Sequence, residues 1–161
     1  MDISTQKIMS NTKSDIETYL NRLKKTFNKS KIKLAEAALF EVINNSPVRT
    51  GAYVENNQIG LNTPVTTNDI VYHKGPGFAQ PMDVGSAFIL KNAVYKQEIR
   101  IAKTAKFEDT IYISNSTPYA HIVEYVGWPQ YGVPAYHPYG RAALSVKAKM
   151  YLIIKSNAPL E

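Results

Sequence analysis

The sequence feature that most constrains the fold is the absence of Gly and Pro between Met1 and Ser46. Apolar residues recur there three or four positions apart, which is typical of one face of a helix. Ser14 suits the N-cap, and acidic residues follow it in the first turn. The residue before Pro47 is disfavoured in helical conformation, so the helix should end near Asn44. The predicted helix from Ser14 to Asn44 is about 45 Å long. Its apolar stripe is Ile16, Leu20, Leu23, Phe27, Leu34, Ala38 and Val42, broken only by Ser30.

Residues 1–13 carry no such pattern, and we expect them to form a flexible N-terminal arm. The remaining residues, 14–161, are enough for one domain with a real hydrophobic core. The sequence therefore predicts a single domain that begins with the long helix.

Weaker signals follow the first helix. An imperfect alternation suggests a strand that includes Tyr53, Val54, Ile59 and Leu61. Residues 63–82 are rich in Thr, Pro and Gly and are expected to form a long connection, in which Ile70–Tyr72 could add a short strand.

Asp83 has the position of an N-cap for the segment that runs through Ala105. Two interpretations of this segment remain open. One is a single helix, and the other is a helix to about Lys91 followed by a strand at Tyr95–Ala102. The β-branched and aromatic run Thr110–Ser114 is a clear strand.

The C-terminal part of the chain favours helix. Tyr119–Tyr125 could form one or two helical turns, and Arg141–Ser156 is an amphipathic helix that closes the domain. The apolar face of this last helix is formed by Leu144, Ala148, Tyr151 and Leu152. The order of elements predicts an α+β fold, with a small antiparallel sheet packed against a long N-terminal helix and a C-terminal helix.

No pattern in the chain indicates an active site. The absence of Cys excludes disulfides, thiolate nucleophiles and thiol-ligated metals. The three His residues stand in no metal-binding spacing, and Walker and GxSxG motifs are absent. The acidic residues are scattered rather than clustered as a metal-dependent nuclease requires. We therefore expect a protein that is not an enzyme and that carries no catalytic residues, cofactor site or metal site.

The net charge of +6 permits contact with nucleic acid, so a small basic nucleic-acid-binding protein is the alternative interpretation. Much of the basic charge lies between Lys13 and Lys33, on the first helix, where a solvated helix face is the favoured explanation over a dedicated binding patch. The aromatic C-terminal loop contains only Arg141 as a cation and Glu124 as an acid. No zinc finger, helix-turn-helix or RNA-binding signature is present.

The segment 115–144 is unusually rich in Pro, Gly and Tyr. Pro restricts the backbone and pre-orders a loop, while Tyr and Trp provide contact area at a low cost in entropy. We expect the loop Gly127–Gly140 and the connection Thr63–Met82 to contact other proteins, although the aromatics could instead pack on their own sheet. The assembly-interface candidates are Trp128, Tyr131, Tyr136, Tyr139 and Arg141.

Three blocks occur in order: SPVRTGAY (46–53), IYISNSTPYAHIVEYVG (111–127) and GVPAYHPYGRAAL (132–144). Together they resemble the tail-completion or minor-tail-protein family of tailed bacteriophages. The chain departs from the family pattern where Val126 separates the acid from Gly127, and in its longer, more aromatic loop. The residues that match are Pro47, Thr50, Gly51, Asn115, Pro118, Tyr119, Ala120, Glu124, Pro134, Ala143 and Leu144.

The resemblance implies a structural virion protein in a ring at the head–tail junction, assembled in the host cytoplasm. Its implied partners are itself, in a hexamer or dodecamer, adjacent connector or portal-side proteins and tail proteins, with non-specific contact to packaged DNA and no membrane. For the motif residues we expect structural roles. Gly51 would turn the chain from helix to strand, Asn115 would bond neighbouring backbone, and Glu124 would cap or pair at the edge of the short helix.

Overall fold

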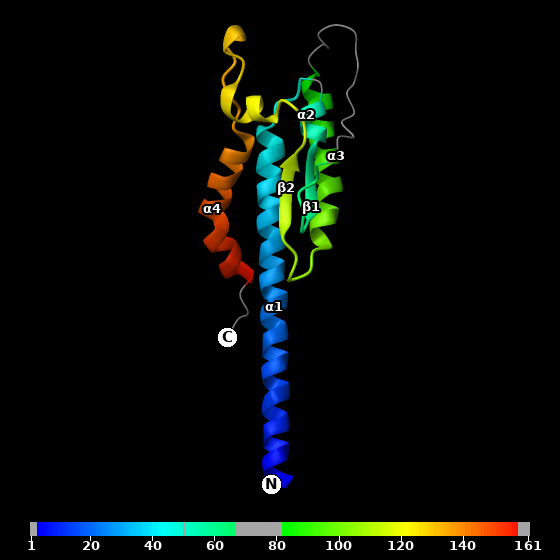
Figure 1. Cartoon of the computed structure of the whole chain (residues 1–161), viewed down its shortest axis with the longest axis vertical. Coiled ribbons are helices and arrows are strands. Elements are labelled where there is room, and N and C mark those ends of the chain that lie inside the picture. The colour runs from blue at the N-terminus through cyan, green and yellow to red at the C-terminus, as the bar shows by residue number, and fades with distance from the viewer. Residues whose placement is uncertain (1–2, 50, 67–81, 158–161) are drawn as a thin grey trace.

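The computed structural model describes residues 3–49, 51–66 and 82–157, with side chains described from residue 12 onward. The long helix α1, Ile3–Asn45, runs almost the full length of the molecule (Figure 1). Its C-terminal half lies between α4, Pro138–Asn157, on one side and the sheet with α3, Val84–Lys103, on the other. Its N-terminal half extends beyond these elements.

The sheet has two strands. β1, Asn57–Leu61, pairs antiparallel with β2, Ile111–Asn115, and Ile59 lies opposite Ile113. This arrangement confirms the predicted α+β class, with a small antiparallel sheet between the long helices. The short helix α2, Ala52–Glu55, leads into β1. A π-helical turn, η1 (Ile122–Val126), and a 3-10 turn, η2 (Pro129–Tyr131), lie between β2 and α4.

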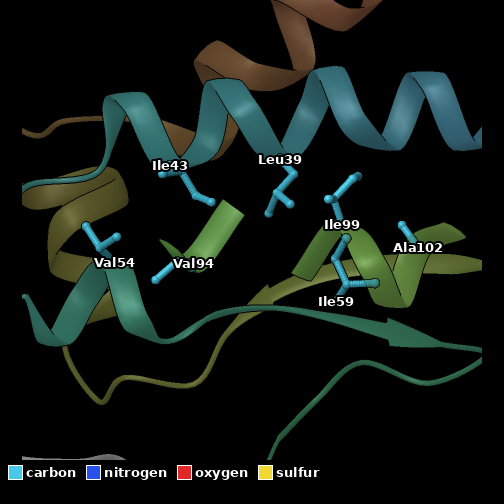
Figure 2. Close-up of a cluster of buried hydrophobic side chains, with 7 residues drawn as sticks. All are labelled: Leu39, Ile43, Val54, Ile59, Val94, Ile99 and Ala102. Atoms are coloured by element: carbon cyan, nitrogen blue, oxygen red, sulfur yellow. The ribbon is translucent and has the colours of Figure 1, made fainter. Parts of the chain in front are cut away.

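The hydrophobic core lies where α1, α2, β1 and α3 meet (Figure 2). Leu39 and Ile43 point from α1 toward Ile59 of β1 and the inner face of α3. Burial of each such side chain contributes about 1.5–3 kcal/mol to folding. The core cluster consists of Leu39, Ile43, Val54, Ile59, Val94, Ile99 and Ala102.

Several predicted boundaries need correction. The first helix begins at Ile3 rather than Ser14, so most of the expected arm 1–13 is helical. Tyr53 and Val54 belong to α2 and not to a strand, because Gly51 reverses the chain and starts a helical turn. The suggested strand at Ile70–Tyr72 lies outside the described residues.

The segment after Asp83 is one helix, so the interpretation with a strand at Tyr95–Ala102 is wrong. The Asp83 carboxylate accepts a hydrogen bond from the Ser86 amide at 3.0 Å, which confirms the predicted N-cap. Arg100 and Lys103 lie in the last turn, where cations are favoured by the helix dipole. Continuous packing of one face against β1 and α1 outweighs the β-branched residues in its second half.

The helix α4 begins at Pro138, before the predicted Arg141, and packs on α1. Ala142 is buried, and Glu41 of α1 accepts hydrogen bonds from Ser145 (2.8 Å) and Lys149 (2.9 Å). The face predicted to be apolar is turned away from the domain. Leu144, Tyr151 and Leu152 are 71%, 68% and 65% exposed.

Part of the basic charge on α1 is used inside the domain. The Lys31 ammonium donates to the carbonyls of Lys106, Phe107 and Asp109 at 2.6–3.0 Å. The Asn28 side chain donates to the Ala105 carbonyl at 2.8 Å. These bonds fix the turn between α3 and β2 against α1.

None of the described helices is long and apolar enough to cross a membrane.

Candidate functional site

The aromatic loop is an ordered hairpin in the structure. Trp128 and Val133 form an antiparallel bridge, with amide-to-carbonyl distances of 2.7 and 3.2 Å. Pro129 opens the 3-10 turn that connects them, where a missing amide hydrogen is tolerated. The Tyr136 amide donates to the Val123 carbonyl at 2.9 Å and ties the loop to η1. The backbone of the loop is therefore held without help from a partner.

Gly127 is required at the base of this hairpin. Its φ of 70° and ψ of −158° lie in a region that residues with a side chain rarely adopt. A Cβ at this position would lie 2.5 Å from both the Val133 oxygen and the Pro134 carbonyl carbon. The backbone around Pro134 thus packs directly on Gly127, which leaves no room for a side chain at this position.

The hairpin forms one wall of a pocket at the end of the domain, with a volume of about 690 Å³. The opposite walls come from the connection between α1 and α2 and from the residues before and within η1. Three of the five interface candidates, Trp128, Tyr131 and Tyr136, line it together with motif residues. The described residues that line it are Pro47, Arg49, Gly51, Tyr53, Tyr119, Val123, Trp128, Gln130, Tyr131, Val133 and Tyr136.

The aromatic residues of the pocket differ in exposure. Tyr131 is 68% exposed and Tyr136 is 36% exposed, whereas Trp128 is half-buried. Tyr53 is 3% exposed, and its ring lies 6.2 Å from that of Tyr119. The pocket therefore has a buried aromatic floor and an exposed aromatic rim.

Burial raises the pKa of the Tyr53 hydroxyl above its usual value, and the nearby Glu124 carboxylate adds to this effect. This hydroxyl has no hydrogen-bond partner among the described residues.

The two remaining interface candidates lie elsewhere. The Tyr139 hydroxyl points into the domain and donates to Oδ1 of Asn57 at 3.0 Å, so it serves packing rather than an outer surface. Burial raises the pKa of this hydroxyl. Arg141 is exposed on α4 and reaches Oδ1 of Asn45 at 3.3 Å.

Asn57 is the residue that sequence analysis missed. It is fully buried, and its amide nitrogen lies within 3.3 Å of the Ser46 hydroxyl and of two carbonyls of α2. Its Oδ1 accepts from Tyr139 and from Asn115, each at 3.0 Å. Asn57 therefore joins α1, α2, β2 and α4 at one point. Its only signal in the sequence was a polar residue at the start of a strand.

The matched motif residues surround this point. Asn115 donates to the Tyr53 carbonyl at 2.8 Å and accepts from the Thr117 amide at 3.0 Å, as expected for a residue that bonds neighbouring backbone. Gly51 has φ 84°, and a Cβ there would lie 2.9 Å from the Leu90 side chain. Thr50 lies outside the described residues. Pro118 is exposed before the turn, and the Ala120 amide donates to Thr117.

Glu124 is buried and caps α4. Its two carboxylate oxygens accept hydrogen bonds from the amides of Gly140 at 2.8 Å and Tyr139 at 3.1 Å. These amides belong to the first turn of the helix, where the helix itself provides no acceptor. Glu124 therefore caps α4 rather than the edge of the short helix, and it fixes the end of the aromatic hairpin to the start of α4.

Most of the residues that line the pocket are aromatic or aliphatic, and Arg49 and Gln130 are the polar ones among them. Such a lining suits the binding of a peptide segment or a side chain.

Among the residues that the structure describes, no group of three or more His, Asp and Glu could hold a metal ion. Comparison with protein-family models, with curated proteins and with solved structures found no match to this chain.

Proposed function

We propose that this chain is a structural virion protein of a tailed phage, which forms a ring at the head–tail junction and joins the head or connector to the tail. The observation that supports it is the pocket, where Pro47, Gly51 and Tyr119 of the resembling motifs meet Trp128 and Tyr131 of the aromatic hairpin. Residues more than sixty positions apart in sequence thus form one surface.

The hairpin has the physical properties of an assembly surface. Its backbone is held by internal hydrogen bonds, so docking costs little loop entropy. Exposed aromatics such as Tyr131 gain contact area when a neighbour covers them. The proposed occupant is a segment of a neighbouring ring subunit or of the adjacent ring.

The chain also has a second apolar surface on a different element. The outer face of α4 exposes Leu144, Tyr151 and Leu152 to solvent. Contacts that close a ring are head-to-tail and join two different surfaces of identical subunits. A subunit with separate apolar surfaces on the pocket end and on α4 meets this requirement.

The decisive experiment is electron microscopy of particles from a phage in which the gene for this chain is disrupted. The proposal predicts filled heads separated from finished tails, or heads that have lost their DNA. Normal intact virions would remove the protein from the structural components.

Point variants test the pocket itself. Tyr131→Ala should impair assembly and leave the melting temperature of the purified protein nearly unchanged, because this side chain is mostly exposed. Tyr112→Ala is the matched control, since Tyr112 lies on β2 outside the pocket. Trp128→Ala should impair assembly in the same way. Normal assembly of the Tyr131 and Trp128 variants would show that the pocket is not the docking surface.

Nucleic-acid binding is distinguished by its salt dependence. Exposed cations on the projecting part of α1, including Arg22, Lys24, Lys25 and Lys29, are the residues that would contact phosphates. A dedicated binder would bind DNA with micromolar or better affinity at physiological salt and weaken steeply as salt rises. Weak binding that is lost at physiological salt is the result expected of a structural subunit.

A further inference from the structure

The projecting half of α1 carries apolar side chains that face solvent. Ile16, Leu20 and Phe27 are 55%, 48% and 54% exposed, and Leu23 between them is half-buried. In Figure 1 this part of the helix extends away from α3, α4 and the sheet. Only the inner end of this face, at Phe27, borders other described parts of the chain, at Phe107 and Ile154. Together these four residues form what we call the α1 seam.

The spacing of the α1 seam is that of a coiled coil. Steps of four, three and four residues separate Ile16, Leu20, Leu23 and Phe27. This repeat places Leu20 and Phe27 at a positions and Ile16 and Leu23 at d positions of a heptad. Such a repeat keeps an apolar seam facing one partner helix, whereas an isolated exposed helix has no need of it.

We infer that the α1 seam binds the α1 seam of a second copy of this chain, with the two helices antiparallel. In an antiparallel pair, a positions pack against d positions. Ile16 then meets the partner's Phe27, and Leu20 meets the partner's Leu23. The same contacts recur by two-fold symmetry, so all four side chains of each seam are covered in one register.

The charges beside the seam select the antiparallel direction. Glu17 and Lys24 both occupy e positions, and e positions face each other in an antiparallel pair. In this register Glu17 of one copy lies beside the partner's Lys24, and the reverse pair forms by symmetry. A parallel pair would instead bring Lys13, at an a position, against the partner's Lys13 and would form no opposite-charge pair across the seam.

The domain extends the contact beyond the seam. Phe27 also lines an apolar groove of about 510 Å³ between the end of α4 and the turn before β2, where Phe107 and Ile154 form the sides. In the antiparallel register the partner's helix upstream of its Ile16 runs along this groove. This additional surface matters because two heptads alone make a marginal coiled coil.

This contact goes beyond the proposed ring and does not depend on it. An antiparallel pair is an isologous contact, which joins two copies and then closes. A ring contact through the pocket uses different residues. Loss of one contact therefore leaves the other intact.

Cysteine cross-linking tests both the contact and its direction, because the natural chain contains no Cys. The full-length variants Ile16→Cys and Phe27→Cys are purified separately, oxidised alone and oxidised as a mixture. The proposal predicts a disulfide dimer in the mixture and little dimer from either variant alone. A parallel pair would cross-link each variant with itself. Dimers of that kind, or no cross-link in any sample, would overturn the proposal.

Charge reversal tests the register. Lys24→Glu and Glu17→Lys should each weaken dimerisation by about tenfold in sedimentation equilibrium, because two favourable pairs become repulsive. The double variant should recover the affinity. Lys25→Glu is the matched control, since it makes the same change in net charge at a position that faces away from the seam. Equal weakening by Lys24→Glu and Lys25→Glu would contradict the proposed register.

Discussion

The hydroxyl of Tyr139, in the first turn of α4, donates a hydrogen bond of 3.0 Å to Oδ1 of Asn57, 82 residues earlier in the chain. Through this bond the C-terminal helix is connected to the start of β1. Asn57 is fully buried and also bonds α2, Asn115 and Ser46. Asn57 therefore connects, through its hydrogen bonds, several of the segments that form the pocket walls.

Asn57→Ala should lower the free energy of unfolding by about 3 kcal/mol, because it leaves several buried groups without a partner. Tyr139→Phe removes only one of these bonds and should cost about 1 kcal/mol. Urea denaturation measures both values. Asn92→Ala is the control, since the side chain of Asn92 donates to the Phe88 carbonyl of its own helix. A cost for Asn57→Ala no larger than that of the control would show that the network contributes little.

Glu124→Gln should destabilise the protein by about 2 kcal/mol. The carboxylate accepts from two amides of α4, and charge-assisted bonds of this kind are the stronger ones. An amide side chain offers only one acceptor oxygen and places hydrogens against the second backbone amide. Guanidinium denaturation provides the measurement, with the exposed Glu108→Gln as reference. Equal midpoints for the two variants would rule out a stabilising cap.

Gly127→Ala should cost about 3 kcal/mol, because it combines an unfavourable φ with a direct overlap of the new Cβ and the Val133 oxygen. Gly132→Ala is the matched control. Its φ of 67° is also positive, but no atom lies within 4 Å of the added Cβ, so about 1 kcal/mol is expected. The single Trp, Trp128, reports on the hairpin by fluorescence. Similar free energies of unfolding and similar Trp128 fluorescence spectra for the two variants would contradict the close packing at Gly127.

Glu98 should make stability depend on pH. It is 4% exposed, and burial raises the pKa of its carboxyl although the Ile59 amide donates to it at 2.6 Å. The folded pKa lies above the unfolded value of about 4.3, so the folded state binds the proton more tightly. Its contribution to stability therefore decreases as pH rises from the unfolded pKa through the folded pKa.

The variant Glu98→Gln cannot titrate at this position. The stability of the variant minus that of the natural protein should rise across this pH range and then level off. Denaturation at a series of pH values gives this difference and cancels the effect of other carboxyl groups, such as Glu41, whose pKa is lowered by Lys149 and Ser145. A difference that stays constant with pH would contradict the effect of burial.

Local signals explain which parts of the fold could be predicted. The end of α1, the Asp83 cap and the strand at Ile111–Asn115 depend on neighbouring residues, and the sequence indicated each of them to within a residue or two. The start of α1 was placed too late, because a polar segment without apolar spacing gave no helix signal, although it contains no residue that breaks a helix.

The site depends on residues far apart, which limits what the sequence can reveal. Trp128 and Tyr131 stood out as aromatics in a Pro-rich loop, and both line the pocket. The opposite wall, with Tyr53, was assigned to a strand, and Asn57 was not recognised because its partners Asn115 and Tyr139 lie 58 and 82 residues away. The outward face of α4 likewise follows from polar contacts to Glu41 that no local pattern reveals.

The unbroken course of α1 has a mechanical consequence. A helix of 43 residues is about 65 Å long and resists bending, so its projecting end and its core end move as one lever. Leu39 and Ile43 hold the core end of the helix by packing in the hydrophobic core. Lys31 holds it by hydrogen bonds to the turn before β2. The far end lies about 40 Å from Lys31 and about 55–60 Å from Leu39 and Ile43, so a small displacement there would be transmitted as torque to the elements that carry the pocket.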